Sequence, residues 1–275
     1  MSVRATAGEA YPGVKQCLAL FHPVVGIIRG RMDAVTVTSD NGPDLRNLLA
    51  CEPLREALGR IVVVNNLSSD GSAAIAREGG AVLVERESRG GYGACVNTGV
   101  PHTGGEAFVV MNPDILLDDA GAVERLSRHL EDPRVAIVVP ALRLPDGRLQ
   151  DSVRHVPTPF DLLTRRLRGT ESGVIREGGE VPWAVAAFYL VRRSAFEAMG
   201  GFDERYFLYF EDVDLCERLR RAGWKIRFDP DVVVRHEFAA ASRRGLLAPA
   251  TRHHMRSAAK FFLRFPRYLV SRRTP

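Results

Sequence analysis

The sequence lacks any long hydrophobic run. Its longest uncharged apolar stretch near the start, from Cys17 to Ile28, is interrupted by His22 and Pro23. That stretch is about 12 residues long, whereas a membrane-spanning helix needs ~20 apolar residues. It has no convincing small-residue cleavage site, so we do not expect a signal peptide. These absences predict a cytoplasmic protein.

Cysteine is also scarce, and low-complexity tracts are missing. The four cysteines are far apart and form no CxxC pair; they are Cys17, Cys51, Cys95 and Cys216. We expect them to be reduced and mostly buried. With 275 residues and 45% hydrophobic content, the chain can bury one substantial domain of roughly 200 residues, plus smaller additions.

Acidic residues are absent from the C-terminal segment. Between Phe238 and Pro275 there are eight arginines, one lysine and no aspartate or glutamate, so this segment carries +9 and the rest of the chain −4. Such a tail suits nucleic acid, an anionic membrane surface or an acidic substrate. Because the body is not basic, we do not expect a dedicated DNA-binding domain.

Strands and helices are expected to alternate from residue 34 onward. Apolar, β-branched runs predict strands over 34–38, 60–64, 81–85, 107–111 and 135–139. Helices are expected between them, including one from Asp44 to about Ala57. This alternation predicts an α/β fold with a mostly parallel sheet covered on both faces.

The second half is less regular. Residues 145–180 are rich in Pro, Gly and Arg and are expected to form a long, mobile excursion. Order is expected to resume at Val181–Val191, followed by a helix over 214–222 and two strands over 225–228 and 232–234.

Asn112, Pro113 and Asp114 directly follow the apolar strand at 107–111. In parallel α/β sheets, ligands bind beyond the carboxyl ends of the strands. A carboxylate there could bind Mg²⁺ or Mn²⁺, which prefer oxygen ligands; alternatively, Asp114 merely caps the next turn. His236, after another strand, is a second candidate ligand if the fold brings it near Asp114.

Residues 202–215 interleave five aromatic residues with five carboxylates ahead of a helix. Aromatic walls raise the pKa of nearby carboxylates, which suits a general base. Glu211 and Asp212 are therefore candidate catalytic residues. The alternative is an ordinary acidic helix N-terminus, because the helix dipole favours negative charge there.

Glycines precede another expected helix, in the segment Gly90–Asn97. They would allow the backbone to approach a phosphate or a sugar closely. The spacing matches neither GxGxxG nor the P-loop, so this segment alone is weak evidence.

Five motifs in order resemble family 2 glycosyltransferases, most closely the bacterial rhamnosyltransferase-like branch. They are VVVNNLSSDGS (62–72), GGYGACVNTG (90–99), VVMNPD (109–114), VPWAVAAFYLVRRSAFEAMGGFDERYFLYFEDVDLCERLRRAGW (181–224) and PDVVVRH (230–236). The resemblance covers about 34 to 240. It implies a GT-A fold, a nucleotide-sugar donor, a glycan or lipid-linked acceptor, and Mg²⁺ or Mn²⁺.

The resemblance also implies roles for individual residues. Asp212, next to Glu211, would be the general base of an inverting transfer. Asp114, with Asn112 in the DXD-type motif, and His236 would hold the metal. Further residues would bind the nucleotide sugar, namely Thr38, Ser39, Asn65, Asp70, Gly93, Asn97 and Asn112. The donor sugar and acceptor would meet Trp183, Arg205 and Tyr209.

Three departures from the family pattern concern the donor. Asn65 replaces the usual Asp, Ala186–Ala187 replaces the usual Gly-Ala pair after Trp183, and Arg89 or its neighbour replaces an Asn. The implied donor is dTDP-rhamnose, and these changes bear on its identity more than on the fold. They also motivate an alternative, a catalytically silent relative that acts as a binding or scaffold subunit.

A nucleotidyltransferase would share the nucleotide-binding plan. It would need a basic phosphate-binding loop after the first strand, and residues 39–44 contain no basic residue.

The expected organisation is an N-terminal extension (1–32), a GT-A domain (33–240) and a basic amphipathic tail (241–275). The tail mixes Arg and Lys with aromatic residues over 251–270. It would either rest on the anionic inner face of the plasma membrane or dock on the domain as an amphipathic helix. Nucleic-acid binding is a third, less favoured interpretation.

Overall fold

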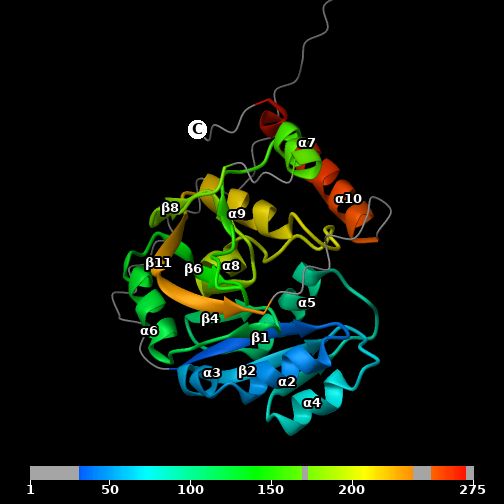
Figure 1. Ribbon diagram of the computed structural model, residues 1–275, viewed down its shortest axis with the longest axis vertical. Helices are drawn as coiled ribbons and strands as arrows, with labels where there is room; N and C mark the ends of the chain where they lie inside the picture. The colour runs from blue at the N-terminus through cyan, green and yellow to red at the C-terminus, as the bar shows by residue number, and fades with distance from the viewer. Residues whose placement is uncertain (1–30, 169–172, 238–248, 271–275) are drawn as a thin grey trace, which may run out of the picture.

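The computed structural model describes residues 31–168, 173–237 and 249–270. The described residues form a nine-stranded sheet in the order β3-β2-β1-β4-β10-β6-β11-β5, with β8 also paired to β11 (Figure 1). Most of the predicted N-terminal extension (1–32) lies outside these residues. β1 begins at Met32, at the end of that segment.

The first half of the sheet is parallel. It consists of β1 (Met32–Thr38), β2 (Leu58–Asn65), β3 (Val82–Glu85) and β4 (Ala107–Met111). Alternate side chains enter two separate cores, so Val35 packs on one face of the sheet and Ala34 on the other. Burial on both faces explains why these strands are continuous apolar runs.

Helices cover both faces of the sheet. One face packs against α2 (Gly42–Ala50), α3 (Glu52–Ala57), α4 (Ser72–Glu78) and α6 (Gly121–Ser127), which is followed by η3 (Arg128–Glu131). The opposite face packs against α5 (Tyr92–Gly99), which continues into η2 (Val100–His102), and against α8 (Arg193–Ala198) and α9 (Glu211–Arg221). The prediction of a single helix from Asp44 to Ala57 was wrong. Cys51 is extended and ends α2, and α3 begins at Glu52 with Pro53 in its first turn.

The second half of the sheet mixes directions. β10 (Phe188–Arg192) runs antiparallel between β4 and β6 (Val135–Arg143), and β11 (Lys225–His236) is parallel to β6. The two strands expected over 225–234 are one strand, β11, with a register shift between Asp229 and Val233. β5 (Ile115–Leu116) pairs antiparallel with β11, which sets His236 opposite Ile115.

The segment 145–180, expected to be a mobile excursion, contains regular structure in its described part. It holds β7 (Val153–Arg154), α7 (Pro159–Arg168) and β8 (Gly179–Val181); β9 (Trp183–Ala184) follows and pairs with β7. Thr158 and Asp161 cap α7 reciprocally: Thr158 Oγ1 donates to Asp161 Oδ2 at 2.7 Å, and Asp161 N donates to Thr158 Oγ1 at 3.2 Å. Composition alone missed this cap.

The described part of the basic tail docks on the domain through α10 (Pro249–Arg264) and η5 (Pro266–Leu269). Phe261 and Tyr268 are fully buried in the core that also contains α9. Arg264 Nη1 lies 2.8 Å from Asp214 Oδ1 of α9. Docking, one of the two expected modes, therefore accounts for the buried aromatic residues. No helix in the described ranges is long and apolar enough to cross a membrane.

Candidate active site

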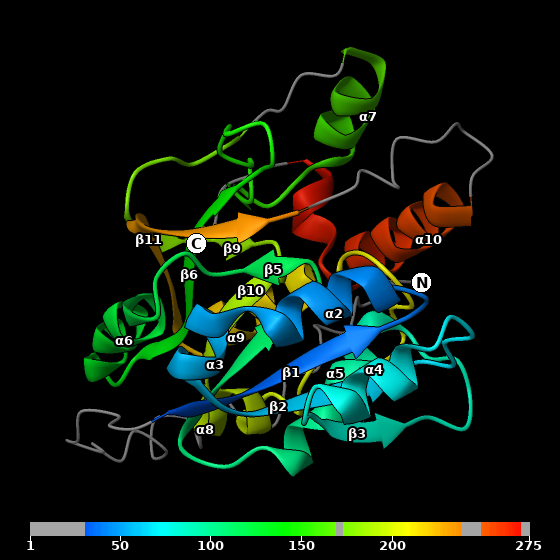
Figure 2. The ribbon, with the colours of Figure 1, turned by 60° about the horizontal axis from the view of Figure 1, so that its bottom comes forward.

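The candidate site lies where β1, β2 and β4 end at Thr38, Asn65 and Met111. This is the carboxyl edge of the parallel half of the sheet, at which α/β proteins bind ligands. Figure 2 shows β1 and β2 from the side covered by α2, α3 and α4.

Asp114 and His236, the two candidate metal ligands, meet at this edge. His236 Nε2 lies 3.2 Å from Asp114 Oδ1, and the backbone N–H of Glu237 donates to Asp114 O at 2.8 Å. The imidazole is buried, and its Nδ1 lies 2.6 Å from Gln150 Oε1. Because Gln150 Oε1 accepts a hydrogen bond, Nδ1 carries the hydrogen, and Nε2 faces the carboxylate.

These two side chains suit a shared cation. A carboxylate oxygen and an imidazole nitrogen at 3.2 Å share either a proton or a metal ion. Within the described ranges, no group of three or more His, Cys, Asp or Glu side chains could hold a metal. The pair could therefore supply only part of a coordination shell, and ligand or water would have to fill the remaining positions.

Asp212 begins α9 in a half-buried position. Desolvation raises its pKa to about 6, although hydrogen bonds from the backbone N–H groups of Val213 and Ala186 oppose the rise. The Ala186 N–H donates to Asp212 Oδ2 at 3.4 Å. A carboxylate with a pKa near neutrality can accept a proton from a hydroxyl group more readily than an ordinary aspartate.

Glu211 is more deeply buried than Asp212. Its Oε2 makes no hydrogen bond within the described residues, and burial followed by the charge of Asp212 raises its pKa well above the usual range. Glu211 is therefore a neutral acid when Asp212 ionises, and Asp212 is the better candidate base.

Two consecutive aromatic residues before Glu211 adopt left-handed backbone conformations. Tyr209 has φ 68° and Phe210 φ 66°, values that bulky L-residues rarely take. The ring of His254, in α10, packs edge-on against both, with centroid distances of 5.2 and 5.4 Å. Ser257 Oγ also donates to Leu208 O at 2.8 Å. Helix α10 thus packs directly against the loop that presents Asp212.

The Ala186–Ala187 dipeptide lies between Asp212 and the 112–114 motif and bonds to both through its backbone. Asn112 N donates to Ala187 O at 2.9 Å, and Tyr92 OH donates to Ala186 O at 3.0 Å. The pKa of Tyr92 is raised by burial and then by the charges of Glu211, Asp212 and Asp114. The charges of the candidate metal ligand Asp114 and of the candidate base Asp212 therefore both act on the hydroxyl group of Tyr92.

Thr38 and Asp70 belong to one network at the ends of β1 and β2. Thr38 Oγ1 donates to Ser72 Oγ at 3.1 Å, and Ser72 Oγ donates to Asp70 Oδ1 at 2.5 Å. Asp70 Oδ2 accepts the Gly42 N–H at 2.7 Å. Asp70 thereby links the N-termini of α2 and α4, and these bonds lower its pKa.

Ser39 and Asn65 lie on the same edge. Arg89 Nη2 donates to Ser39 Oγ at 2.8 Å, and Asn65 Oδ1 accepts the Ser68 N–H at 3.0 Å. The neighbouring Asn66 makes a two-way bond to Gly90: Gly90 N donates to its Oδ1, and its Nδ2 donates to Gly90 O, at 2.8 and 3.1 Å. Thus Arg89 and Asn66 join the glycine turn to the strand ends.

Gly93 and Asn97 contact protein rather than open space. A Cβ atom on Gly93 would lie 2.6 Å from Phe202 Cβ. Asn97 Oδ1 accepts the Phe202 N–H at 2.9 Å, and its Nδ2 donates to Phe202 O at 2.8 Å and to Glu204 Oε1 at 3.1 Å. In the described structure both residues hold the 202–204 loop against α5, which explains the small residue and the amide at these positions.

Arg205 makes no ion pair with Asp114, Glu211 or Asp212 among the described residues. Its guanidinium is largely exposed and pairs with Asp203 at 2.5 Å. Trp183 is buried, with Nε1 donating to His155 O at 3.0 Å. Nearby, Arg154 pairs in register with Trp183, and its charge lowers the pKa of Asp212.

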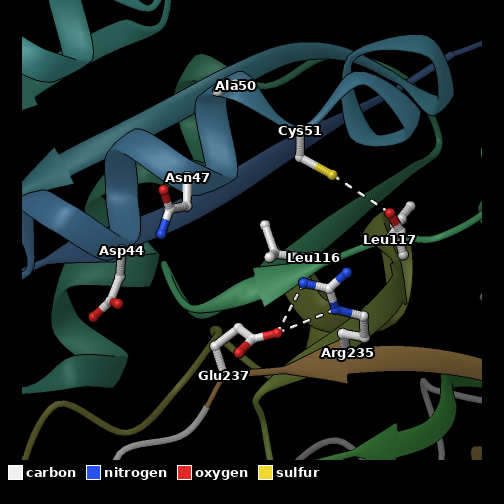
Figure 3. A pocket seen from close by; sticks show the side chains of 8 residues that line it. All are labelled: Asp44, Asn47, Ala50, Cys51, Leu116, Leu117, Arg235 and Glu237. Atoms are coloured by element: carbon white, nitrogen blue, oxygen red, sulfur yellow. Dashed lines mark hydrogen bonds and ion pairs between the residues drawn. The ribbon is translucent and has the colours of Figure 1, made fainter. Parts of the chain in front are cut away.

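A pocket of about 610 Å³ is lined by Arg235 and Glu237, the two residues on either side of His236 in the chain (Figure 3). It lies between α2 and the β5–β11 edge and is lined by Asp44, Asn47, Ala50, Cys51, Leu116, Leu117, Arg235 and Glu237. Arg235 and Glu237 form an ion pair at 2.9 Å on one wall. Burial and the charge of Asp114 raise the pKa of Asp44.

The sequence motifs did not reveal every residue of the site. The residues missed were Gln150 beside His236, Tyr92 and the Ala186 N–H beside Asp212, Asn66 on the glycine turn, and Arg154. Tyr92 lies inside the GGYGACVNTG motif and could have been chosen as a buried hydroxyl. Gln150 carries no local signal, because it comes near His236 only when its backbone N–H bonds to Leu142 O of β6 and β6 pairs with β11.

Known proteins are similar to this chain in sequence and in fold. Residues 42–258 match the family described as "Glycosyltransferase like family 2". The N-acetylglucosaminyl-diphospho-decaprenol L-rhamnosyltransferase of Mycobacterium tuberculosis is 32% identical over 256 residues, which cover 81% of each chain. Rhamnosyltransferase WbbL of Escherichia coli K12 is 30% identical over 164 residues, covering 57% of this chain and 61% of WbbL.

Solved structures agree with the GT-A fold. Mannosyltransferase PcManGT from Pyrobaculum calidifontis superposes with a TM-score of 0.57 at 20% identity, covering 93% of this chain and 77% of that one. Glucosyl-3-phosphoglycerate synthase from Mycobacterium tuberculosis superposes with a TM-score of 0.56 at 18% identity, covering 93% and 85%. The chain belongs to the family 2 glycosyltransferases, in their rhamnosyltransferase-like branch, and has a GT-A fold.

Proposed function

We propose that this glycosyltransferase inverts the anomeric centre of a nucleotide sugar in a metal-dependent transfer to an acceptor hydroxyl. The observation that carries the proposal is the Ala186–Ala187 bridge. Its hydrogen bonds to Asp212 and to Asn112 hold a basic carboxylate and the metal motif in one site. A catalytically silent scaffold would not need Asp212 to have a pKa near neutrality.

Asp212 acts as the general base. Its carboxylate accepts the proton of the acceptor hydroxyl as that oxygen attacks the anomeric carbon from the face opposite the leaving nucleoside diphosphate. One attack of this kind gives inversion. Glu211, buried and protonated, keeps a second negative charge away from Asp212.

Asp114 and His236 would hold the metal, with Gln150 fixing the imidazole ring. Mg²⁺ or Mn²⁺ bound there would offset the negative charge of the leaving nucleoside diphosphate. The structures of glucosyl-3-phosphoglycerate synthase and PcManGT include Mn²⁺ with a nucleotide sugar, which supports this assignment. Thr38, Ser39, Asn65 and Asn112 line the nucleotide side of the site.

The favoured donor is dTDP-rhamnose, and the favoured acceptor is a saccharide linked to a polyprenyl diphosphate. The activity named for the Mycobacterium tuberculosis relative, at 32% identity over most of both chains, supports both choices. Trp183 and Tyr209 flank the acceptor side. We expect the enzyme to work at the inner face of the plasma membrane, where such acceptors are anchored.

The test is a transfer assay with a short polyprenyl-diphosphate N-acetylglucosamine acceptor, Mn²⁺ and a panel of dTDP-rhamnose, UDP-glucose and GDP-mannose. Wild-type protein should transfer rhamnose and invert the anomeric centre, as read by NMR of the product. Asp212→Asn should lose transfer but keep nucleotide binding, whereas Asp231→Asn, at an exposed carboxylate on β11, should retain activity. Retention of configuration, or full activity of Asp212→Asn, contradicts the proposal.

A further inference from the structure

Large exposed apolar side chains concentrate at one end of the molecule. Of the nine among the described residues, six belong to α7, α10 and the chain just after it: Phe160, Leu163, Met255, Leu263, Leu269 and Val270. Figure 1 places these elements at the upper end, away from α2 and α4. Single exposed apolar residues are normal on a protein surface, but a group of this size marks an interaction site.

The outward side of α10 has a regular arrangement. Met255, Ala259 and Leu263 recur every four residues and therefore form one stripe along the helix. Met255 is 62% exposed and Leu263 84% exposed. The stripe is not part of the core, because the buried Ser257 and Phe261 lie on the opposite side of the same helix.

Cations accompany the stripe. Arg252, Arg256 and Lys260 are exposed and also recur every four residues, on the same outward side; the ammonium of Lys260 also donates to Arg205 O of the domain. Helix α10 contains no acidic residue. Their long aliphatic chains can lie along an apolar surface while the charged groups reach outward.

Helix α10 also contacts the loop that precedes the candidate base. His253 stacks on Phe207 with a centroid distance of 4.5 Å, and His254 contacts Tyr209, two residues before Glu211. A surface bound along α10 would therefore lie beside the loop that presents the base.

We propose that the outward face of α10, formed by Arg252, Met255, Arg256, Ala259, Lys260 and Leu263, docks on an anionic lipid bilayer. Alternating apolar and cationic side chains on an exposed helix suit the interface between acyl chains and anionic headgroups. A docked protein partner would instead need acidic and apolar groups in matching order. The biological role of docking, delivery of a lipid-linked acceptor, rests on the proposed function, whereas docking itself does not.

The experiment is co-sedimentation of the full chain with vesicles of phosphatidylcholine, with and without phosphatidylglycerol, in the absence of donor and acceptor. Wild-type protein should bind the anionic vesicles, and binding should weaken as salt is raised. The Met255→Glu/Leu263→Glu variant should bind about tenfold more weakly or worse, because burial of one leucine side chain is worth roughly a factor of ten. Arg252→Gln/Arg256→Gln should lose the preference for anionic lipid.

Leu67→Glu is the matched control, since Leu67 is 48% exposed and lies between β2 and α4. It should bind vesicles as the wild type does, and circular dichroism should show every variant folded. The proposal is overturned if the wild type does not bind anionic vesicles. It is also overturned if the Met255→Glu/Leu263→Glu variant binds them as well as the wild type does. So does a wild-type dimer that those charges dissociate without any vesicle binding. Because the assay contains no sugar donor, its failure leaves the proposed transfer reaction untouched.

Discussion

The backbone N–H of Ala186 donates to the carboxylate of Asp212, 3.4 Å away, while the carbonyl of the same residue accepts from Tyr92. The peptide backbone around Ala186 therefore determines where the candidate base lies. The family's usual Gly-Ala pair is replaced here by Ala186–Ala187, yet both hydrogen bonds use main-chain atoms and are independent of the side chain. The departure that raised the scaffold alternative does not remove this arrangement.

Tyr92→Phe tests the arrangement. The change leaves Ala186 O without its donor and should lower stability by about 1–2 kcal/mol and transfer by roughly tenfold, since the Asp212 carboxylate loses its fixed neighbour. Tyr206→Phe is the control, because its hydroxyl group donates to Asp214 at 3.3 Å, on the side of α9 that faces α10. A similar loss of stability with full activity is expected there; equal loss of activity in both variants would show that only stability matters.

Asp212 should set the acidic limb of the pH–rate profile. The folded-state pKa is about 6, so kcat/KM should fall below pH 6 as Asp212 becomes protonated. The measurement is kcat/KM against pH with excess metal. The Asp212→Glu variant places a carboxyl group with a different pKa at this position. If the acidic limb of its residual activity stays at the same pH as in the wild type, the titration belongs to another group.

The raised pKa of Asp212 also means that its ionised form destabilises the folded protein at high pH. An unfolded aspartate has a pKa of ~3.9, so between that value and about 6 the folded state holds the proton more tightly. The stability from this group is fully present at low pH and is lost as pH rises through 6. Asp212→Asn should therefore raise the free energy of unfolding at pH 8 by ~1–3 kcal/mol. The gain should nearly vanish at pH 4, as measured by urea denaturation.

Gln150 should control metal affinity without touching the metal. Gln150→Leu removes the acceptor from His236 Nδ1 and should weaken Mn²⁺-dependent nucleotide binding by about 10- to 100-fold, the usual effect of losing such a partner. Gln150→Glu keeps an acceptor and should restore binding. Calorimetry with UDP or dTDP and Mn²⁺ measures both. Unchanged affinity in the leucine variant would remove Gln150 from the metal site.

Two arginines bind the same carboxylate in different surroundings. Arg264 pairs with Asp203 and with the fully buried Asp214, whereas Arg205 pairs with Asp203 at the surface. Arg264→Met should cost more, about 1–3 kcal/mol, because it removes one of the two arginines that pair with the buried Asp214, while Arg218 stays 2.6 Å away. Arg205→Met should cost less than ~1 kcal/mol. Comparable losses in thermal denaturation would mean that Asp214 is less dependent on α10 than the contacts indicate.

The sequence predicted the parallel half of the sheet closely, because buried strands such as 60–64 and 107–111 are continuous apolar runs. It also brought Asp114, His236 and Asp212 into consideration through an ordered motif set. It could not place Gln150 or the Ala186 N–H, because strand pairing and a main-chain bond position them. Asn97 and Gly93 fitted a ligand pattern, but they pack against the 202–204 loop, and short-range patterns do not distinguish those uses.

The position of α10 also affects the order in which the chain can fold. Glu217, in the middle of α9, is completely buried, and its carboxylate is bound by Arg267 and by Tyr268 OH, close to the end of the described chain. During synthesis, α9 leaves the ribosome about 50 residues before these partners. The nascent domain must therefore leave this side of α9 open to water until η5 emerges. Truncation at residue 258, where the family match ends, would make that incomplete state permanent.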